Sequence, residues 1–376
     1  MGQRAADSAA PPAIVIAGGG TGGHLYPGIA VAREYLRRFP QAAVSFAGTA
    51  RGLEARVVPH EGFALDLIRS AGLKGKSWGA RVRGASLVVP SMLEAWRVIS
   101  RRKPSVVVGV GGYSSGPIVL MAAIRGVPTM VLEQNAVPGL TNRLLARVVR
   151  RAAVTYDETL PFFRGKAVVT GNPVRAEFFS TPSGTGPRAS ARVLILGGSQ
   201  GAHVINLALV AAAAELVRER PDLELVHQTG ERDRDGVRRE YANAGIRARA
   251  EAFLDPVAAE VMAADLIVCR AGATTLAELA AAGKPAVLVP LAAATDDHQR
   301  KNARVLVDGG AAEMVEEKDL TGDRVAAVVG RLLGDRSRLE AMAHAMRGFA
   351  KPNAAADIVT LVATLARVPD ASAGGR

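Results

Sequence analysis

The sequence of 376 residues has little cysteine, few aromatic side chains and no long apolar run. Its single cysteine, Cys269, excludes an internal disulfide and any metal site built from several cysteines. The six histidines show no zinc-ligand spacing, so no structural metal is expected. No stretch approaches the roughly 18 apolar residues of a spanning helix, and the N-terminus does not resemble a signal peptide. These absences predict a cytoplasmic protein, which can still lie against a membrane.

The residues that are present suit two apolar cores and an anionic partner. Apolar residues make up 49% of the chain, which is long enough for two domains. The formal net charge of +12 favours nucleic acid, phosphorylated ligands or an anionic membrane face, unless it serves solubility alone. Aromatic residues are only 4% and no nucleic-acid-binding motif is present, so no nucleic-acid partner is expected.

Short β-branched runs alternate with Ala-, Leu- and Arg-rich stretches along the chain. Because the runs are apolar at every position, they are typical of parallel strands buried on both faces. Helices are expected between them, for example at residues 28–38 and 274–282. This rhythm predicts the α/β class, with two Rossmann-like doubly wound domains facing a cleft. The expected strands are residues 14–17, 44–47, 106–110, 129–132, 193–196, 223–228, 266–269 and 286–289.

A segment rich in Ser, Pro and Gly divides the chain near its middle, at residues 180–191. The predicted organisation is an N-terminal domain at 12–178, a linker at 179–191 and a C-terminal domain at 192–350. Residues 351–368 are expected to form a terminal helix that returns to the first domain, with Pro352 just before it.

Residues 18–23 match G-x-G-x-x-G, the pattern of dinucleotide-binding loops. Such a loop lets the backbone approach a ligand and directs a helix N-terminus toward an anion. NAD binding also requires an acid at the end of the second strand. Here that strand ends in FAGTA, at residues 46–50, without an acid. A dehydrogenase is therefore disfavoured, and tight packing alone does not explain Thr21 and His24 at the mouth of the loop.

Further Gly-rich polar segments follow other expected strands, and they are predicted to meet at one cleft because ligands bind at the carboxyl ends of such strands. They are residues 109–117, 133–142, 170–175 and 197–202. A fifth, within 264–290, predicts a strand, a tight turn at Gly272, a helix and a strand. Thr274 and Glu278 share one helix face, suited to a phosphate and to ribose hydroxyls. The alternative is a capping threonine with a glutamate stabilised by the helix dipole.

Eight motifs, in order, resemble the MurG family of membrane-associated N-acetylglucosaminyltransferases: GGGTGGHLYPGIA, GLKGK, GGYSSGP, EQNAVPGLTN, GNPVR, GGSQGA, CRAGATTLAEL and DDHQRKNA. They span residues 14 to 303. The resemblance implies an inverting transfer of GlcNAc from UDP-GlcNAc to the C4 hydroxyl of the MurNAc unit of lipid I, giving lipid II without metal or cofactor. It implies a location at the cytoplasmic face of the plasma membrane, with cell-wall and division proteins as further partners.

The resemblance also implies roles for single residues. The acceptor is expected to contact Tyr113, Ser114 and Ser115. The general base is either His24 or Glu133, and His24 could instead bind the acceptor diphosphate. UDP-GlcNAc is expected to contact Thr21, Gly22, Gly23, Asn135, Arg175, Ser199, Leu254, Ala273, Thr274, Thr275, Leu276, Ala277, Glu278, His298 and Gln299.

Residues 72–104 mix basic side chains with apolar and indole groups, a composition that suits an anionic membrane interface. The end that carries Trp78 is the expected membrane contact. Residues 87–99 form either part of that contact or an ordinary amphipathic helix packed on the first domain. Two other functions stay open at this point: a related transferase with another lipid acceptor, such as diacylglycerol, and a sugar-nucleotide epimerase.

Overall fold

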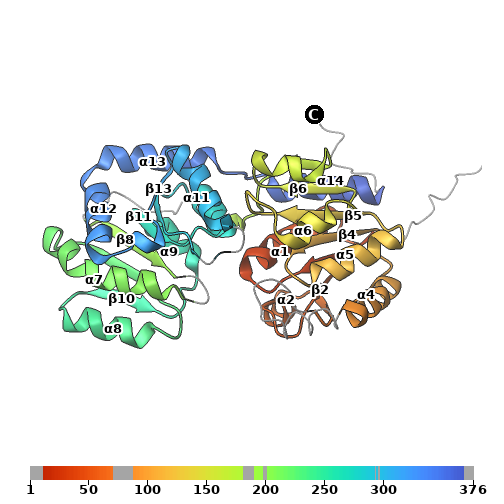
Figure 1. Cartoon of the computed structure of the whole chain (residues 1–376), viewed down its shortest axis with the longest axis horizontal. Helices are drawn as coiled ribbons and strands as arrows, with labels where there is room; N and C mark the ends of the chain where they lie inside the picture. Colours follow the sequence, from red (N-terminus) through yellow and green to blue (C-terminus); the bar gives the residue numbers. More distant parts are fainter. Residues whose placement is uncertain are drawn as a thin grey trace, which may run out of the picture. The chain divides into compact units, whose positions relative to one another are not determined.

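The computed structural model describes residues 12–70, 88–180, 190–197, 201–292, 294 and 297–367. The chain divides into two compact units, whose elements are labelled in Figure 1. Unit 1 contains residues 1–134, 138–173 and 353–376, and unit 2 contains residues 135–137 and 174–352. The chain thus enters unit 2 at Val174, five residues before the predicted linker begins, and returns to unit 1 at Asn353.

Unit 1 is built on a parallel sheet. Among the described residues the strand order is β3-β2-β1-β4-β5-β6-β7, and all neighbours pair in parallel. The order reverses between β1 and β4, so the loops after these two strands lie at the topological switch point, where open α/β sheets bind ligands. The strands are β1 (Ala13–Gly18), β2 (Ala43–Gly48), β3 (Ala64–Leu67), β4 (Val106–Gly111), β5 (Thr129–Glu133), β6 (Arg151–Val154) and β7 (Ala167–Val169).

Helices cover both faces of this sheet because side chains alternate along a buried strand. Ile14 and Ile16 of β1 belong to the apolar cluster with α1 and α14, while Val15 and Ala17 belong to the cluster with α4, α5 and α6. The helical segments of unit 1 are α1 (Gly22–Arg38), α2 (Glu54–His60), α4 (Val88–Arg102), α5 (Ser115–Ile124), α6 (Leu140–Leu145), η1 (Asp157–Phe163) and α14 (Ala354–Ala366).

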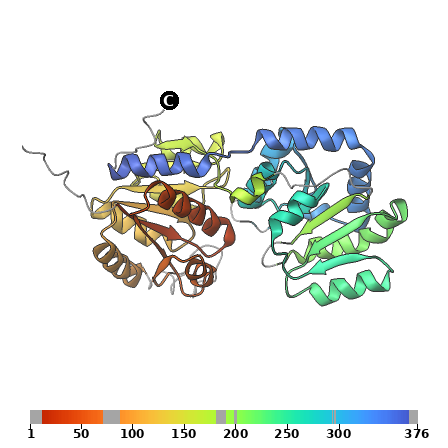
Figure 2. The same ribbon diagram turned by 180° about the vertical axis from the view of Figure 1, so that it is seen from behind.

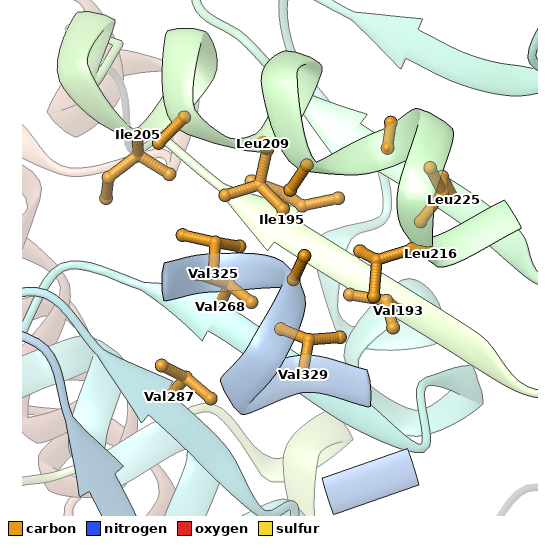
Figure 3. Packing of buried hydrophobic residues seen from close by; sticks show 14 of the residues in the cluster. Val193, Ile195, Ile205, Leu209, Leu216, Leu225, Val268, Val287, Val325 and Val329 are labelled. Atoms are coloured by element: carbon orange, nitrogen blue, oxygen red, sulfur yellow. The ribbon is translucent and has the colours of Figure 1, made fainter. Parts of the chain in front are cut away.

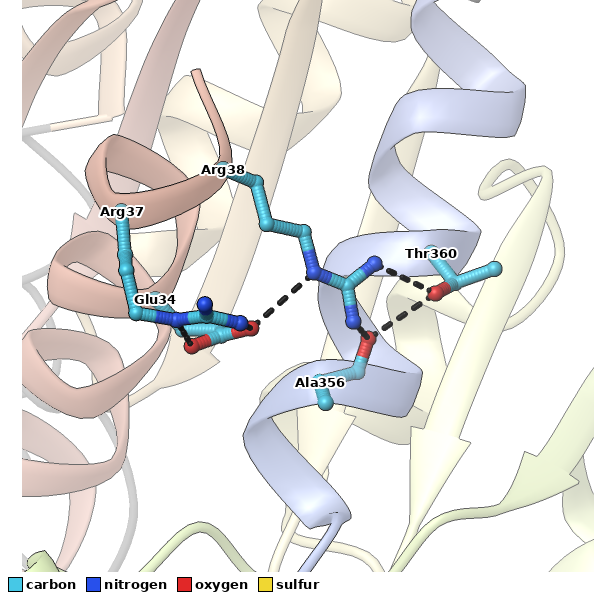
Figure 4. Close-up of polar contacts among 5 residues, drawn as sticks. All are labelled: Glu34, Arg37, Arg38, Ala356 and Thr360. Atoms are coloured by element: carbon cyan, nitrogen blue, oxygen red, sulfur yellow. Dashed lines mark hydrogen bonds and ion pairs between the residues drawn. The ribbon is translucent and has the colours of Figure 1, made fainter. Parts of the chain in front are cut away.

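Helix α14 belongs to unit 1 although it follows all of unit 2 in the sequence. Its residues Ile358, Val359 and Val362 are fully buried in the cluster that contains α1, and Figure 2 shows α14 in dark blue beside α1 in red. Arg38 of α1 donates to the carbonyl oxygen of Ala356 at 2.9 Å and to the hydroxyl of Thr360 at 2.8 Å (Figure 4). Burial and hydrogen bonds together anchor the returning helix.

Unit 2 repeats the same plan. Among its described residues the strand order is β10-β9-β8-β11-β12-β13, again all parallel. The switch point falls between β8 and β11. The strands are β8 (Arg192–Leu196), β9 (Glu224–Gln228), β10 (Ala248–Glu251), β11 (Leu266–Cys269), β12 (Ala286–Leu288) and β13 (Ala312–Met314).

The larger core of unit 2 lies between its sheet and the helices α7 and α12. Figure 3 shows Ile205 and Leu209 of α7, with Val325 and Val329 of α12, against the valines and isoleucine of the central strands. The helical segments are η2 (Ala176–Phe179), α7 (His203–Glu219), α8 (Arg234–Asn243), α9 (Val257–Ala263), α10 (Ala273–Ala282), α11 (His298–Asp308), η4 (Glu317–Asp319), α12 (Gly322–Gly334) and α13 (Arg336–Gly348).

The prediction of two Rossmann-like α/β domains is confirmed, but one predicted helix boundary is wrong. The first helix begins at Gly22, not at residue 28. The carbonyl oxygen of Thr21 accepts from the N–H groups of His24 and Leu25, which starts the helix at the glycines. Pro27 then lies inside the helix and forgoes one backbone hydrogen bond. His24 is therefore a helical residue of the first turn, with its side chain set by the helix.

Candidate active site

In unit 1, two glycine loops pack backbone against backbone at the switch point. A Cβ atom on Gly18, at φ +145°, would clash with the backbone carbonyl oxygen of Gly111 at the end of β4. A Cβ atom on Gly112, at φ +80°, would lie 2.6 Å from the carbonyl oxygen of Gly19. Glycine is required at both positions for close approach and for a left-handed backbone. The predicted loop at residues 18–23 and the one at 109–117 are thus neighbours.

Thr21 and His24 lie at the mouth of the first loop. Thr21 precedes α1 with an extended backbone and an exposed side chain, and its Oγ1 lies 3.3 Å from Nδ1 of His24. The half-buried imidazole covers Gly111, where a Cβ atom would lie 2.6 Å from Cδ2 of the ring. Gly22 and Gly23 form the intervening first turn and are also half-buried. A hydroxyl and an imidazole are therefore held together at the edge of the sheet where a ligand is expected.

Glu133, the other predicted base, is tied into its own loop. It ends β5 and is 3% exposed. Its Oε2 accepts from the side-chain amide of Asn142 at 2.8 Å and from the N–H group of Gly139 at 3.1 Å. Both partners are donors, so they stabilise the carboxylate as an acceptor that organises the turn into α6. This arrangement favours His24 over Glu133 as the residue that takes a proton.

The predicted acceptor residues differ in exposure. Tyr113 is 53% exposed, and its carbonyl oxygen accepts from the hydroxyl of Ser70 at 3.0 Å. Ser114 and Ser115 are buried at the start of α5. Of the three side chains, only that of Tyr113 is presented to solvent.

In unit 2, the start of α10 lies at the switch point, directly after β11. Gly272 caps this helix with an extended backbone, at φ −69°, in the short turn between β11 and α10 where the sequence predicts it. A Cβ atom there would make only ordinary contact, at 3.8 Å from the hydroxyl of Thr275. Ala273 and Leu276 are buried, while Thr274, Thr275 and Ala277 are half-buried. The N–H groups at the helix N-terminus and two threonine hydroxyls thus occupy the position suited to a phosphate.

Glu278 lies one turn into the same helix and faces Arg175. The guanidinium Nη2 lies 3.3 Å from Oε1 of Glu278, and Nη1 lies 3.0 Å from Oε1 of Glu177. The Arg175 guanidinium also stacks 5.0 Å from the ring centroid of Phe178. Burial raises the pKa of Glu278 to about 7, against the opposing effect of Arg175. The carboxyl is therefore poised to change charge near neutral pH.

Asn135 lies in unit 2, where it contacts Asn302, a buried residue that has no role in the sequence analysis. Asn302 of α11, fully buried, donates to Oδ1 of Asn135 at 3.1 Å and accepts from the N–H group of Ala136 at 2.9 Å. It also donates to the carbonyl oxygen of Ala271, just before α10, at 3.4 Å. Asn302 thus connects Asn135 to the loop that starts α10. Its only sequence signal is its place within the DDHQRKNA motif.

The other predicted donor residues are spread over three loops of unit 2. Leu254 is buried after β10. His298 begins α11, and the side-chain oxygen of Gln299 accepts from the N–H group of Leu291 at 3.0 Å. Ser199 lies outside the described residues. A Cβ atom on Gly197 would lie 2.8 Å from the carbonyl oxygen of Gln228 at the end of β9, and one on Gly201 would lie 2.8 Å from that of Thr229.

Within the described ranges, no group of three or more His, Cys, Asp or Glu side chains is placed to hold a metal ion. No helix in the same ranges is long and apolar enough to cross a membrane. Residues 71–87, which include Trp78, lie outside the described residues.

Two doubly wound sheets, each with glycine-rich or helix-starting loops at its switch point, match the architecture of two-domain glycosyltransferases. Residues 14–154 match the glycosyltransferase family 28 N-terminal domain, and residues 192–359 match the family 28 C-terminal domain. The chain belongs to the MurG family, the UDP-N-acetylglucosamine–N-acetylmuramyl-(pentapeptide) pyrophosphoryl-undecaprenol N-acetylglucosamine transferases. The family that the eight sequence motifs indicate is thereby confirmed.

The similarity covers almost the whole chain. It is 46% identical to the enzyme of this name from Anaeromyxobacter sp. (strain K), over 94% of this chain and 93% of the relative. It is 43% identical to the enzyme of the same name from Myxococcus xanthus (strain DK1622), over 94% of this chain and 92% of the relative. The crystal structure of Acinetobacter baumannii MurG superposes with a TM-score of 0.75 at 32% identity, over 94% of this chain and 100% of that chain.

The fold alone is shared more widely. A UDP-GlcNAc 2-epimerase from Neisseria meningitidis, solved with UDP-GlcNAc bound, has a TM-score of 0.68 at 15% identity, over 94% of this chain and 100% of that chain. The architecture therefore does not by itself separate transfer from epimerisation, and the identity of 43–46% to named transferases carries that distinction.

Proposed function

We propose that the chain transfers GlcNAc from UDP-GlcNAc to the C4 hydroxyl of the MurNAc unit of undecaprenyl-pyrophosphoryl-MurNAc-pentapeptide (lipid I), giving lipid II. The C4 oxygen forms a bond to C1 of GlcNAc while the bond from C1 to the diphosphate breaks. UDP leaves with the electron pair, and the anomeric centre inverts. The observation that carries the proposal is the start of α10, where phosphate-suited N–H groups and hydroxyls lie one turn from Glu278.

Unit 2 is proposed to bind the donor. The N-terminus of α10, with Thr274 and Thr275, stabilises the diphosphate and the charge that grows on it as UDP leaves. Glu278 accepts hydrogen bonds from the ribose hydroxyls, and Arg175 supplies a cation to the phosphates. The backbone near Leu254 holds the uracil, and Ser199 contacts the phosphate. The side chains of His298 and Gln299 contact the GlcNAc hydroxyls. Ala273, Leu276 and Ala277 contribute through the backbone and shape of the helix start.

Unit 1 is proposed to supply the base and the acceptor site. His24 takes the proton of the attacking hydroxyl, because its imidazole is only half-buried and lies beside Thr21 at the ligand edge of the sheet. The residues 21–23 and Asn135 contact the GlcNAc part of the donor. Tyr113 offers the exposed side chain for the acceptor, and Ser114 and Ser115 contribute through the start of α5.

The acceptor carries a polyprenyl tail, so the proposal places the protein on the cytoplasmic face of the plasma membrane. Helices α4, α5 and α6 pack in this order and expose apolar side chains. We call this set the α4–α6 apolar surface: Val88, Val89, Leu93, Trp96, Leu120, Ile124, Leu140 and Leu144. Exposed arginines accompany it, and the guanidinium of Arg125 lies 5.8 Å from the ring centroid of Trp96. Apolar and cationic groups together suit an anionic bilayer, and cell-wall and division proteins remain proposed partners.

The deciding experiment measures UDP release from UDP-GlcNAc with and without lipid I, together with the sugar products. The proposal expects UDP release that depends on the acceptor and a lipid-linked disaccharide as product. Replacing lipid I by diacylglycerol should give no transfer. Release without any acceptor, transfer to diacylglycerol, or conversion of the donor to UDP-ManNAc would each contradict it.

A further inference from the structure

The carboxylate of Glu54 lies inside the glycine loop of unit 1. Glu54 begins α2 and is 1% exposed. Its Oε2 accepts from the N–H group of Gly20 at 2.7 Å, and its Oε1 accepts from the N–H group and the hydroxyl of Thr49 at 2.8 and 2.9 Å. All three groups are donors, so they hold the Glu54 carboxylate as an acceptor. The side chain thus ties the loop after β1 to the loop after β2.

Three glycines leave the space that this carboxylate fills. A Cβ atom on Gly19, Gly48 or Gly52 would meet the Glu54 side chain at or below 2.5 Å, closer than real Cβ contacts come. Gly19 has a φ of +145°, which by itself favours glycine, but Gly48 and Gly52 have no left-handed backbone. At these two positions the missing side chain makes room for Glu54.

The N–H groups of a glycine loop between a strand and a helix are an anion site. In this chain the N–H group of Gly20 already donates to an internal carboxylate. A phosphate at the same N–H group would meet the negative charge of the buried Glu54 carboxylate. The loop therefore matches the dinucleotide pattern without offering this N–H group to a phosphate.

We propose that Glu54 is a positioning residue, an internal anion that holds residues 21–24 in place for transfer. The connection is short and continuous. Gly20, bonded to Glu54, precedes Thr21, whose Oγ1 lies 3.3 Å from His24 Nδ1 and whose carbonyl oxygen accepts from the N–H group of His24. Displacement of a catalytic group by about 1 Å can cost on the order of 100-fold in rate. The inference rests on the proposed function, because it takes His24 as the base.

The first test is Glu54→Gln, which keeps the shape but replaces one acceptor oxygen by a donor. We expect kcat for acceptor-dependent transfer to fall about 10- to 100-fold, with a smaller change in KM for UDP-GlcNAc, since residues 21–23 are proposed to contact its sugar. UDP binding, measured by calorimetry, should be unchanged. The matched control is Glu34→Gln in α1. This change removes the ion pairs of Glu34 with Arg37 and Arg38 but makes no contact with the glycine loop at residues 18–23. Its kcat should stay within about twofold of wild type.

The second test displaces the carboxylate without removing it. In Gly52→Ala the new methyl group occupies the place of Glu54 Oε2, the end of a side chain that can swing away, so the fold should tolerate it. Its kcat should fall as in Glu54→Gln. In a His24→Gln background, Glu54→Gln should lower the remaining rate by no more than about twofold, because both changes act through one group.

The outcomes separate this inference from the proposed function. Wild type without acceptor-dependent UDP release refutes the proposed function, and the inference fails with it. An active wild type with Glu54→Gln and Gly52→Ala both within twofold in kcat overturns the inference alone. The inference is also overturned if Glu54→Gln lowers kcat by the same factor in the His24→Gln variant as in wild type. Glu54 would then act independently of His24.

Discussion

Glu278 combines burial with one nearby cation, and the balance between them sets its charge near neutral pH. Because burial raises its pKa to about 7, roughly one tenth of the groups are ionised at pH 6 and nine tenths at pH 8. The ionised form accepts more strongly from ribose hydroxyls. We predict that the affinity for UDP rises up to about tenfold from pH 6 to pH 8, measured by calorimetry. Glu278→Gln should remove this dependence, and identical pH profiles for the two proteins would contradict the assignment.

The two candidate bases are separated by substitution of each with glutamine. His24→Gln should lower kcat about 10²- to 10⁴-fold, the contribution of general-base catalysis, with little change in KM for UDP-GlcNAc. Glu133→Gln should lower kcat less, because Glu133 already accepts from Gly139 and Asn142 and organises its loop. Steady-state kinetics and circular dichroism of both variants check this. If a folded Glu133→Gln variant loses more kcat than His24→Gln does, Glu133 is the general base.

At the scale of elements, regular features were predictable from sequence and individual contacts were not. Buried parallel strands are apolar runs, so the strands that the sequence analysis names lie close to their observed bounds. The strands β3, β6, β7, β10 and β13, each three or four residues long, are not among them. The start of α1 was misplaced because the glycines and Pro27 have low helix propensity, whereas the carbonyl of Thr21 starts the helix there. Glu54 was missed because its role depends on Gly48 and Gly52 around it, and no local motif encodes that packing.

Helix α14 closes one face of the unit 1 sheet, so its apolar side chains should matter for stability. Ile358 is fully buried in the cluster with α1. Ile358→Ala should lower the free energy of unfolding of unit 1 by about 2–4 kcal/mol, measured by urea unfolding with tryptophan fluorescence. The matched control is Leu361→Ala, a partly buried position on the same helix, which should cost less. Equal costs would mean that burial against α1 does not anchor the helix.

The α4–α6 apolar surface predicts membrane binding through unit 1. Leu93→Glu and Ile124→Glu place charges on two of its helices, at positions that are 55% and 67% exposed. Each should weaken binding to vesicles of anionic phospholipid at least about tenfold, because an apolar side chain is lost and a like charge is added. Cosedimentation measures this. Leu207→Glu on α7 of unit 2, also 56% exposed, is the control and should bind like wild type.

At the scale of the whole molecule, each of the two units has its own sheet and apolar cores, and the proposed function divides the tasks between them. In that proposal the diphosphate lies at the β8–β11 switch point of unit 2, and the base and the acceptor lie at the β1–β4 switch point of unit 1. The same architecture therefore serves two chemistries, because the residues after the central strands differ. In unit 2 an anionic nucleotide is proposed to meet a helix N-terminus, whereas the corresponding loop in unit 1 holds an internal carboxylate.

This division predicts how a nucleotide changes the unfolding of the protein. UDP lacks the sugar that unit 1 is proposed to contact, so it should stabilise unit 2 alone, by about 2.7 kcal/mol at 100 times its Kd. Both tryptophans, Trp78 and Trp96, belong to unit 1, so their fluorescence reports on that unit. In thermal unfolding followed by circular dichroism, UDP should raise the midpoint temperature of the unit 2 transition. The midpoint temperature measured by tryptophan fluorescence, which reports on unit 1, should stay the same. A fluorescence midpoint that moves equally would show that UDP also stabilises unit 1.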